Sequence, residues 1–467
     1  MASPNSYDVI VVGSGSAGFS AVESAHALGA RVCLVEVEKL GGECPNHACV
    51  PSKALLKTAQ IYRTIMNAKP FGVVLGSTSF QFSDAIKYRD RVVKVLTGGG
   101  KHGERYEMML KDMNVDVKFG SVSFFHDHVL VVGGENLHGN SIVIATGTVD
   151  FVPPIRGLDK IHYISWRNAL LPIRQPKSMA IIGGGPVGCE IATFYASFGT
   201  RVVLFQQSGR LLTREDEEIS RQAQSLLEKL GVEVVLNADI SEIVDGRGVY
   251  GVKTKNSNTE QVHAVEQIVL AAGKRANTDT LQLDSAGVKT NEKGEIITNN
   301  EQRTNVKHIF AAGDVDGGLQ FTHTAHYEGS VAGYNSALTA LNKRSEKQVV
   351  DERVVPRITY LSSEVASVGM TEKEGKEKFK NVLIGICDFS EIGRSLTDNE
   401  TGGIVKLVVH PKTRKILGGH IVSSRAGEMI HEVAIAMYAN LTIDTLANMI
   451  HAYPSFSEAI KVAASRV

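Results

Sequence analysis

The chain has 467 residues, more than one hydrophobic core normally serves, so we expect two to four domains. Lysine plus arginine and aspartate plus glutamate both total 50, and basic residues are not clustered, which argues against nucleic acid or an anionic membrane as partner. No basic-then-apolar leader and no run of about 18 apolar residues is present, so we expect a cytoplasmic protein that acts on small molecules.

The first predicted unit is a dinucleotide-binding motif. An apolar strand at residues 7–12 leads into a glycine-rich turn at 13–18, and a helical pattern and a second strand follow, ending at Glu36. The glycines permit a tight turn and close approach of a pyrophosphate, while Glu36 can accept hydrogen bonds from a ribose. These spacings together predict a nucleotide site.

Two cysteines follow in a proline-containing segment. Cys44 and Cys49 are five positions apart, which in an ideal helix is ~7.5 Å of rise, whereas a disulfide tolerates at most about 7 Å between α-carbons. The segment therefore cannot be regular helix throughout. We expect a turn at Pro45 and Asn46, and a helix that begins near Cys49 with Pro51 in its first turn. A helix N-terminus favours a thiolate, so the pair is interpreted as a redox-active disulfide.

Zinc is the alternative for such a pair. Structural zinc needs four ligands, and the five cysteines contain no second close pair, so we expect no metal centre. Cys33, Cys189 and Cys387 lie in apolar segments and are expected to be small buried residues. In a reducing compartment a paired disulfide is more often catalytic than structural.

A second dinucleotide-binding motif is predicted further along the chain, with strands at 178–182 and 201–205 around a glycine turn at 183–188. Its ribose position, 23 residues after the first glycine as in the first motif, holds Gln206 instead of an acid. A glutamine does not repel a 2′-phosphate, and Arg210 and Arg214 follow, so NADPH is weakly favoured over NADH. Alternatively, both arginines simply lie on a solvated face.

Three further features lie outside the two dinucleotide-binding motifs. The apolar strands at 142–147 and 268–273 end in Ala-Thr-Gly and Ala-Ala-Gly and are interpreted as chain crossings between nucleotide-binding domains. A buried strand within 305–314 ends at Asp314, near which a ribityl hydroxyl could bind. A charged hinge at 343–352 then leads to a segment of different pattern.

This last segment predicts an α+β module around an antiparallel sheet, because strand candidates precede helical runs. The strands are expected at 357–360, 382–386, 404–410 and 417–422, and the helices at 428–440 and 443–450. The module contains no phosphate loop, so we expect it to serve assembly.

Together these motifs resemble the pyridine nucleotide-disulfide oxidoreductases, flavoproteins that include dihydrolipoyl dehydrogenase, glutathione reductase and mercuric reductase. The Gly-Gly-x-Cys-x-Asn-x-x-Cys-Val-Pro-Ser-Lys stretch at 41–53 is highly specific, and the likeness spans nearly the whole chain. The resemblance implies an α/β fold with two Rossmann-like domains, for FAD and NAD(P), and a C-terminal α+β dimerisation domain. Its expected boundaries are 1–150 and 275–345 for the FAD domain, 151–274 for the NAD(P) domain and 350–467 for the dimerisation domain.

The resemblance also implies site residues. FAD would be bound by Gly13, Gly15, Gly18, Glu36, Gly42, Lys53, Thr146, Gly147 and Asp314. NAD(P)H would be bound by Gly183, Gly185, Gly188, Gln206 and Gly273. Lys53 and Glu190 match the family pair near the flavin ring. Hydride would pass from the nicotinamide to one flavin face, and electrons would leave the other face through Cys49, with Cys44 as the thiol that meets the substrate.

One position departs from the usual family pattern. Residues 453–458 match the family's His-Pro-Thr-Leu-Ser-Glu motif, but Tyr453 replaces the histidine that acts across a dimer interface on dithiols, while Glu458 is retained. A tyrosine, with a pKa near 10, exchanges protons poorly at neutral pH. His451 is interpreted as a packing residue without a defined partner. Mercuric reductases show tyrosine at this site, although residues 463–467 lack their terminal cysteine pair and no N-terminal metal-binding domain precedes the first strand.

The leading prediction is therefore a mercuric-reductase-like FAD enzyme. It would act as a homodimer and use NAD(P)H to reduce a metal ion such as Hg(II) or another small electrophilic oxidant. A dihydrolipoyl dehydrogenase or related disulfide reductase is the enzymatic alternative, opposed by Tyr453. A flavin-binding protein without turnover is the alternative from another class, opposed by the intact cysteine pair.

Overall fold

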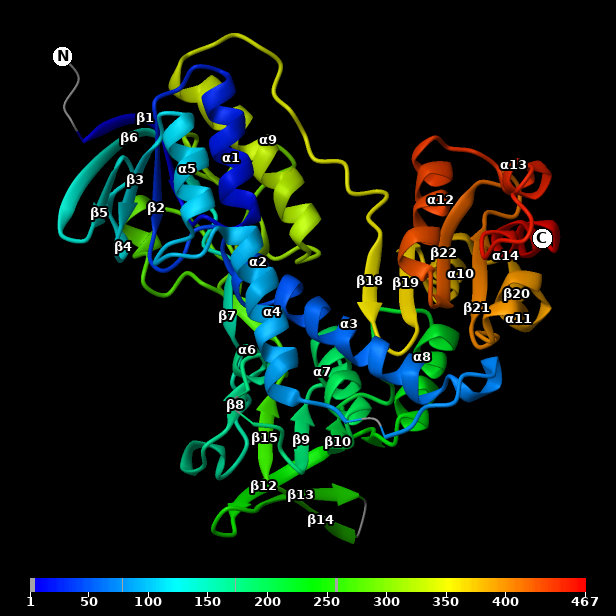
Figure 1. The fold of residues 1–467 in the computed structure, drawn as a ribbon. Helices are drawn as coiled ribbons and strands as arrows, with labels where there is room; N and C mark the ends of the chain where they lie inside the picture. The colour runs from blue at the N-terminus through cyan, green and yellow to red at the C-terminus, as the bar shows by residue number, and fades with distance from the viewer. Residues whose placement is uncertain (1–4, 78, 173, 257–258) are drawn as a thin grey trace. The chain divides into compact units, whose positions relative to one another are not determined.

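The computed structural model describes residues 5–77, 79–172, 174–256 and 259–467. This part of the chain divides into two compact units, whose helices and strands are labelled in Figure 1. Unit 1 contains the described residues up to Pro51 together with Lys87–Phe151 and Gly273–Glu352. Unit 2 contains Ser52–Ile86, Val152–Ala272 and Arg353–Val467.

The core of unit 1 is a seven-stranded sheet in the order β3-β2-β1-β6-β5-β4, with β17 also paired to β6. The pairs among β1, β2, β3, β6 and β17 are parallel, and β4 and β5 continue the sheet in antiparallel pairing. Strands buried on both faces have nearly continuous apolar sequences, as in β2. The strands are β1 (Ser6–Val12), β2 (Val32–Glu36), β3 (Asp116–Phe119), β4 (Val122–His126), β5 (Val129–Val132), β6 (Glu135–Ile144) and β17 (Ile309–Ala311).

Helices α1 (Ser16–Ala27) and α9 (Thr322–Ala340) lie side by side in unit 1 (Figure 1). A Cβ atom on Gly329 or Gly333 of α9 would lie 2.1 Å or 2.2 Å from a backbone oxygen of α1. The two helices therefore pack with their backbones in contact, which fixes α9 beside the first glycine turn. The remaining helices that begin in unit 1 are α2 (Glu43–Asn46), α3 (Cys49–Met66), α5 (Glu104–Asp112) and the short 3₁₀ segments η3 (Leu283–Ala286) and η4 (Asp314–Asp316).

Unit 2 contains a second parallel sheet in the order β11-β10-β9-β15-β8, and a separate antiparallel sheet β12-β13-β14. The parallel sheet is formed by β8 (Ile164–Ser165), β9 (Ser178–Ile182), β10 (Arg201–Phe205), β11 (Glu233–Val235) and β15 (Gln267–Leu270). The antiparallel sheet is formed by β12 (Asp239–Asp245), β13 (Tyr250–Asn256) and β14 (Thr259–Val265). Helix α4 (Phe82–Thr97) begins in unit 2 and continues in unit 1, and the other helices of unit 2 include α6 (Trp166–Ala169), α7 (Pro186–Ser197) and α8 (Glu217–Lys229).

The C-terminal part of unit 2 is an antiparallel sheet in the order β18-β19-β22-β21-β20, so the predicted α+β module is confirmed. Its strands are β18 (Arg357–Tyr360), β19 (Glu364–Gly369), β20 (Leu383–Asp388), β21 (Ile404–Val409) and β22 (Ile416–Ser423), and its helices are α10 (Glu372–Phe379), α11 (Gly393–Asp398), α12 (Ala426–Tyr438), α13 (Ile443–Asn448) and α14 (Glu458–Ser465). The sequence analysis missed β19, because its middle residues are the small Ala366 and Ser367, which carry little β-propensity.

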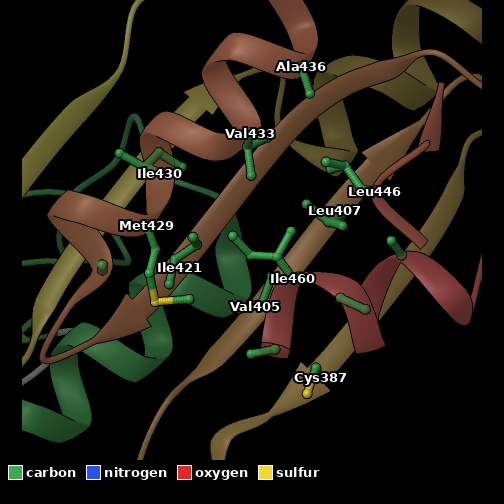
Figure 2. Packing of buried hydrophobic residues seen from close by; sticks show 14 of the residues in the cluster. Cys387, Val405, Leu407, Ile421, Met429, Ile430, Val433, Ala436, Leu446 and Ile460 are labelled. Atoms are coloured by element: carbon green, nitrogen blue, oxygen red, sulfur yellow. The ribbon is translucent and has the colours of Figure 1, made fainter. Parts of the chain in front are cut away.

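The core of this module lies between α12 and the sheet, as Figure 2 shows. Met429, Ile430 and Val433 of α12 belong to one buried cluster with Val405, Leu407 and Ile421 of the sheet and Ile460 of α14. The overall architecture is therefore the predicted α/β fold with two nucleotide-binding motifs and a C-terminal α+β module. No helix among the described residues is long and apolar enough to cross a membrane.

Candidate active site

The first glycine turn follows β1 and opens α1. Gly13 has a φ of +99°, and a Cβ there would lie 2.3 Å from the backbone oxygen of Ala145. A Cβ on Gly18 would lie 1.8 Å from the backbone oxygen of Gly13. A Cβ on Gly15, by contrast, would meet no atom within 4 Å. The first and third glycines are thus required by packing, while the second leaves the open space that a pyrophosphate needs.

Glu36 ends β2 beside this turn. Its carboxylate accepts hydrogen bonds from the backbone N–H and the hydroxyl of Ser14, at 2.9 Å and 2.5 Å. The N–H groups of Val37 and Glu38 also donate to it, at 2.7 Å and 2.9 Å. These bonds hold the acid at the strand end, where the motif requires a ribose acceptor.

The second glycine turn, after β9, repeats this geometry. A Cβ on Gly183 (φ +120°) would lie 2.1 Å from the backbone oxygen of Ala271, a Cβ on Gly188 would lie 1.9 Å from that of Gly183, and a Cβ on Gly185 would meet nothing within 4 Å. Gln206 accepts a hydrogen bond from the N–H of Gly184 at 2.9 Å, matching the Ser14–Glu36 contact. The two sites therefore differ in the charge of the residue at the ribose position.

The two arginines after Gln206 make different contacts. Arg210 donates to the backbone oxygens of Glu215 and Thr213, both at 2.7 Å, so its guanidinium folds back onto its own loop. Arg214 has an exposed side chain, and its backbone oxygen accepts a hydrogen bond from Arg357 at 3.1 Å. Arg214 is the more accessible of the two cations.

The cysteine segment lies against the first glycine turn. Helix α3 begins at Cys49, as expected, whereas Pro45 and Asn46 belong to the short helix α2 instead of a simple turn. The side chain of Asn46 donates to the backbone oxygens of Leu40 and Gly42, at 3.0 Å and 2.8 Å, which closes this short helix. A Cβ on Gly42 (φ +66°) would lie 2.5 Å from the α-carbon of Gly15. The segment is therefore fixed directly beside the predicted pyrophosphate position.

Each cysteine of the predicted redox pair has a neighbour that the sequence analysis missed. The Sγ of Cys49 lies 3.4 Å from the Oγ1 of Thr322, the first residue of α9 and 273 positions away in sequence. Burial, together with the charge of the nearby Cys44 thiolate, raises the pKa of Tyr106. No local motif could have identified either neighbour, because the packing of unit 1 brings Tyr106 of α5 and Thr322 of α9 to the cysteines from distant segments.

The other three cysteines are buried, as expected. Burial raises the pKa of Cys33 to about 12 and that of Cys387 to about 11, and it raises the pKa of Cys189 further. A thiol with so high a pKa is a poor nucleophile at neutral pH. Thiolate chemistry at these three positions is therefore disfavoured.

The two predicted chain crossings lie side by side in unit 1, because β7 (Thr148–Asp150) pairs with β16 (Lys274–Ala276) in antiparallel register. The hydroxyl of Thr146 donates to the backbone oxygen of Asn277 at 2.8 Å, and the N–H of Asn277 donates to the backbone oxygen of Gly147 at 2.9 Å. The carbonyl of Gly273 accepts a hydrogen bond from Phe151 at 3.0 Å. These bonds join the two crossings into one connection.

Asp314 lies close to this connection. Its carboxylate accepts a hydrogen bond from Thr148 at 3.3 Å, and burial raises its pKa although the cation of Lys274 opposes the shift. Lys274 in turn pairs with Glu43, next to Cys44, at 2.7 Å. A buried acid near a glycine turn fits the predicted hydrogen bond to a ribityl hydroxyl.

The predicted pair Lys53 and Glu190 is present in unit 2. The Nζ of Lys53 lies 2.9 Å and 2.8 Å from the two carboxylate oxygens of Glu190, whose side chain is only 9% exposed. The N–H of Tyr360 also donates to Glu190, at 3.1 Å, and the ring of Tyr360 lies 4.7 Å from the Lys53 ammonium. Lys53 follows Cys49 by four positions in α3. The pair therefore joins a nearly buried carboxylate to a lysine whose side chain is 36% exposed.

The C-terminal motif lies between α13 and α14. Tyr453 is 80% exposed, and the carboxylate of Glu458 accepts a hydrogen bond from the N–H of Ser455 at 3.0 Å. His451 lies 2.7 Å from the carboxylate of Glu432, so the expectation that this histidine lacks a defined partner is wrong. A cavity of about 430 Å³ adjoins the motif, lined by Arg394, Arg425, Glu428, Met429, Glu432 and residues 454–457.

Comparison with known proteins assigns the family. Residues 7–329 match the model of the pyridine nucleotide-disulphide oxidoreductases, and residues 355–464 match the dimerisation domain of the same family. The chain belongs to the pyridine nucleotide-disulphide oxidoreductase family. It is therefore an enzyme of a class that depends on FAD and a pyridine nucleotide, and it carries the family's dimerisation domain.

Within this family the chain is similar to enzymes of two named activities. It is 34% identical to a mercuric reductase of Staphylococcus aureus, over 98% of this chain and 82% of the relative. It is 33% identical to a dihydrolipoyl dehydrogenase of Bacillus subtilis (strain 168), over 98% of this chain and 97% of the relative. Among solved structures it is similar to the HOCl-induced flavoprotein disulfide reductase RclA from Escherichia coli, with 30% identity, a TM-score of 0.85 and coverage of 99% and 100% of the two chains. A Cu(II) complex of RclA matches with 29% identity, a TM-score of 0.84 and coverage of 97% and 98%.

Proposed function

We propose that this flavoenzyme is a mercuric-reductase-like reductase that uses NADPH to reduce a soft metal ion, Hg(II) or copper, through Cys44 and Cys49. The observation that carries the proposal is Tyr453, an exposed phenol at the position where disulfide-reducing members of the family have a histidine. The similarity to mercuric reductase and to a protein solved as its Cu(II) complex supports the same substrate class.

The cysteine pair suits such an ion. Thiolates are the preferred ligands of soft metal ions, and two of them can bind one ion without proton transfer from the protein. Cys49 is the first residue of α3, so the helix N-terminus stabilises its thiolate, and the Thr322 hydroxyl 3.4 Å away can donate to it. Cys44 is the thiol proposed to meet the incoming ion.

The electron balance is simple for Hg(II). NADPH gives two electrons and leaves as NADP⁺ and a proton, and the ion takes both electrons to become the neutral metal. FAD, when bound, supplies the two-electron relay between nicotinamide and disulfide. The protein's own task is to hold the thiolates, position both nucleotides and keep the Lys53–Glu190 pair charged near the flavin.

Gln206 and Arg214 carry the preference for NADPH. A carboxylate at the ribose position would repel a 2′-phosphate, whereas the amide of Gln206 does not, and the exposed Arg214 can reach an anion. Glu36 at the matching position of the first site keeps the acid that suits the unphosphorylated ribose of FAD.

The dimerisation domain is proposed to build a two-fold homodimer. Large apolar residues remain exposed along α12 and the C-terminal segment, among them Ile435 at 68%, Tyr438 at 64% and Ile450 at 92%. A symmetric dimer would cover such a surface and place Tyr453 and Glu458 over Cys44 of the partner subunit.

One observation favours a second candidate, a disulfide reductase of the dihydrolipoyl dehydrogenase type. His451 and Glu432 lie 2.7 Å apart, and a histidine held by a carboxylate is a common general acid–base arrangement. The candidate requires this pair to replace the missing histidine at position 453. The His451 side chain is only 4% exposed, however, which limits its access to any substrate.

A panel of acceptors tests the proposal. NADPH oxidation is followed anaerobically with Hg(II), Cu(II), lipoamide and glutathione disulfide, using wild type, Cys44→Ser/Cys49→Ser and His451→Gln. We expect metal-dependent oxidation that the cysteine substitutions abolish and His451→Gln leaves unchanged. Fast lipoamide turnover that His451→Gln abolishes would instead establish the second candidate.

A further inference from the structure

A group of histidines lies at one edge of the large sheet of unit 1, and the proposed function uses none of it. Asp127 and His128 form the turn between β4 and β5, and His308 immediately precedes β17. One ring nitrogen of His128, one of His308 and one carboxylate oxygen of Asp127 lie within 4.8 Å of one another. His126 and His138 flank the group: Nδ1 of His126 lies 3.4 Å from Asp127, and the His138 ring stacks on His128 with centroids 5.7 Å apart.

The backbone holds both histidines in place through the same strand, β6. The N–H of Gly139 donates to the backbone oxygen of His128 at 3.0 Å. The hydroxyl of Ser141 and the N–H of Ile142 both donate to the backbone oxygen of His308, at 2.7 Å and 2.9 Å. Segments about 180 residues apart in sequence are thus fixed side by side by a buried strand, and not by a loop alone.

Hydrogen bonds to backbone oxygens also orient the two imidazole rings. The Nδ1 of His128 lies 2.7 Å from the backbone oxygen of Gly139, which can only accept, so Nδ1 is the donor of this bond and Nε2 is the ring nitrogen that it leaves for an ion. A histidine whose second nitrogen donates to a carbonyl is the usual form of a metal ligand. The Nε2 of His308 lies 3.0 Å from the backbone oxygen of Asp127 and 3.7 Å from its carboxylate, so the two residues face each other.

We propose that Asp127, His128 and His308 bind one divalent transition-metal ion such as Zn²⁺, Ni²⁺ or Cu²⁺. Two imidazoles and a carboxylate suit these ions, whereas Mg²⁺ and Ca²⁺ prefer oxygen ligands alone. His126, whose Nδ1 lies 3.4 Å from the Asp127 carboxylate, is a further donor for a fourth position. This site is separate from the cysteine pair and its proposed chemistry, since it contains no thiol and holds its ion without electron transfer.

A small movement completes the site. The rings of His128 and His308 stack with centroids 3.7 Å apart and an interplanar angle of 8°. An ion with ligands at about 2.0–2.1 Å needs those atoms about 3.3 Å apart, so atoms that now lie within 4.8 Å of one another must close in by up to about 1.5 Å. Rotation of one ring about χ2, a broad torsion in histidine, would bring the atoms closer at the expense of the ring stacking. The ion then replaces ring stacking as the link between the β4–β5 turn and β17.

The test uses the full-length, tag-free chain carrying Cys44→Ser and Cys49→Ser, so that the reactive thiols cannot bind the probe. One equivalent of Cu²⁺ is added and its electron paramagnetic resonance spectrum recorded, and Zn²⁺ affinity is measured by calorimetry. We expect splitting from imidazole nitrogens and a single Zn²⁺ equivalent. Adding His128→Gln and His308→Gln should remove the splitting, whereas the exposed His162→Gln, a matched control outside the group, should leave it unchanged.

Asp127→Asn provides an independent test, because this side chain is half exposed and the substitution changes its charge but hardly its size. It should weaken Zn²⁺ binding about tenfold or more, the scale expected when a charged ligand is lost. Circular dichroism and FAD content confirm that each variant is folded. Spectra and affinities unchanged in both the histidine and the aspartate variants would overturn the proposal and leave the group as a packed histidine stack.

Discussion

The ammonium of Lys53 lies within 2.9 Å of both carboxylate oxygens of Glu190, a residue 137 positions away in sequence. Because the Glu190 side chain is only 9% exposed, loss of its cation leaves a nearly buried carboxylate that still accepts a hydrogen bond from the N–H of Tyr360 at 3.1 Å. Charged hydrogen bonds of this kind contribute about 1.5–3 kcal/mol.

Lys53→Met should therefore lower the free energy of unfolding by about 1–3 kcal/mol and slow flavin reduction by NADPH. Lys53→Arg, which keeps the charge, is the matched control and should lose less stability. Chemical denaturation and anaerobic stopped-flow absorbance measure the two effects. Equal stability of the Met and Arg variants would show that the ion pair contributes nothing to the fold.

A second prediction concerns Cys49 and Cys44. If Cys49 is the thiolate next to the flavin, two-electron reduction of wild type should produce a long-wavelength thiolate-to-flavin charge-transfer band. Cys44→Ser should keep a band because Cys49 remains at the start of α3, and Cys49→Ser should abolish it. The opposite pattern in the two variants would reverse the assigned roles.

A third prediction concerns the buried carboxylate of Glu328 and its effect on how the stability of the fold depends on pH. Burial, with the nearby carboxylates of Asp316 and Glu352, raises the pKa of Glu328, and burial raises the pKa of Asp316 to about 7. The folded chain thus binds protons that the unfolded chain, with carboxyl pKa values near 4, has already released. This contribution to stability is complete at acidic pH and is lost as pH rises from about 5 to about 8.

Glu328→Gln should flatten that dependence, because glutamine does not ionise and can still accept the 2.6 Å hydrogen bond from Gly313. The thermal midpoint measured between pH 5.5 and 8.5 should fall less in this variant than in wild type. Glu292→Gln, at an exposed position, is the control and should follow wild type. Parallel curves for Glu328→Gln and wild type would contradict the assignment.

A fourth prediction concerns cofactor choice at Gln206. Gln206→Glu restores the acid found at the matching position of the first site and should shift kcat/KM toward NADH by about tenfold, or 1.4 kcal/mol. Arg214→Gln should weaken NADPH use without affecting NADH. A wild-type enzyme that already prefers NADH tenfold would refute the proposed preference.

The sequence predicted the local parts of this site well because they are defined by short-range constraints. The glycine spacings, Glu36, Gln206 and the helix start at Cys49 all follow from what a turn or helix end permits, and the structure has them as expected. Partners supplied by tertiary packing were missed. Thr322 reaches Cys49 only because α9 packs on α1, and the Glu432 partner of His451 comes from a neighbouring helix.

The strand β19 was missed for a related reason. Its small central residues give no clear strand pattern, yet pairing with β18 and β22 on both sides makes it a central strand of the C-terminal sheet. Position within the sheet, and not intrinsic propensity, determines that such a segment forms a strand.

Tyr453 provides the most direct test of the proposed substrate class. We would measure kcat for lipoamide and for Hg(II) reduction in wild type, Tyr453→His and Tyr453→Phe under the same conditions. The account predicts slow lipoamide turnover in wild type that Tyr453→His raises by about 10²-fold, the lower end of general acid–base catalysis, and metal reduction that Tyr453→Phe impairs. A wild-type kcat for lipoamide above roughly 10 s⁻¹ that Tyr453→His leaves unchanged would contradict it and favour a disulfide reductase.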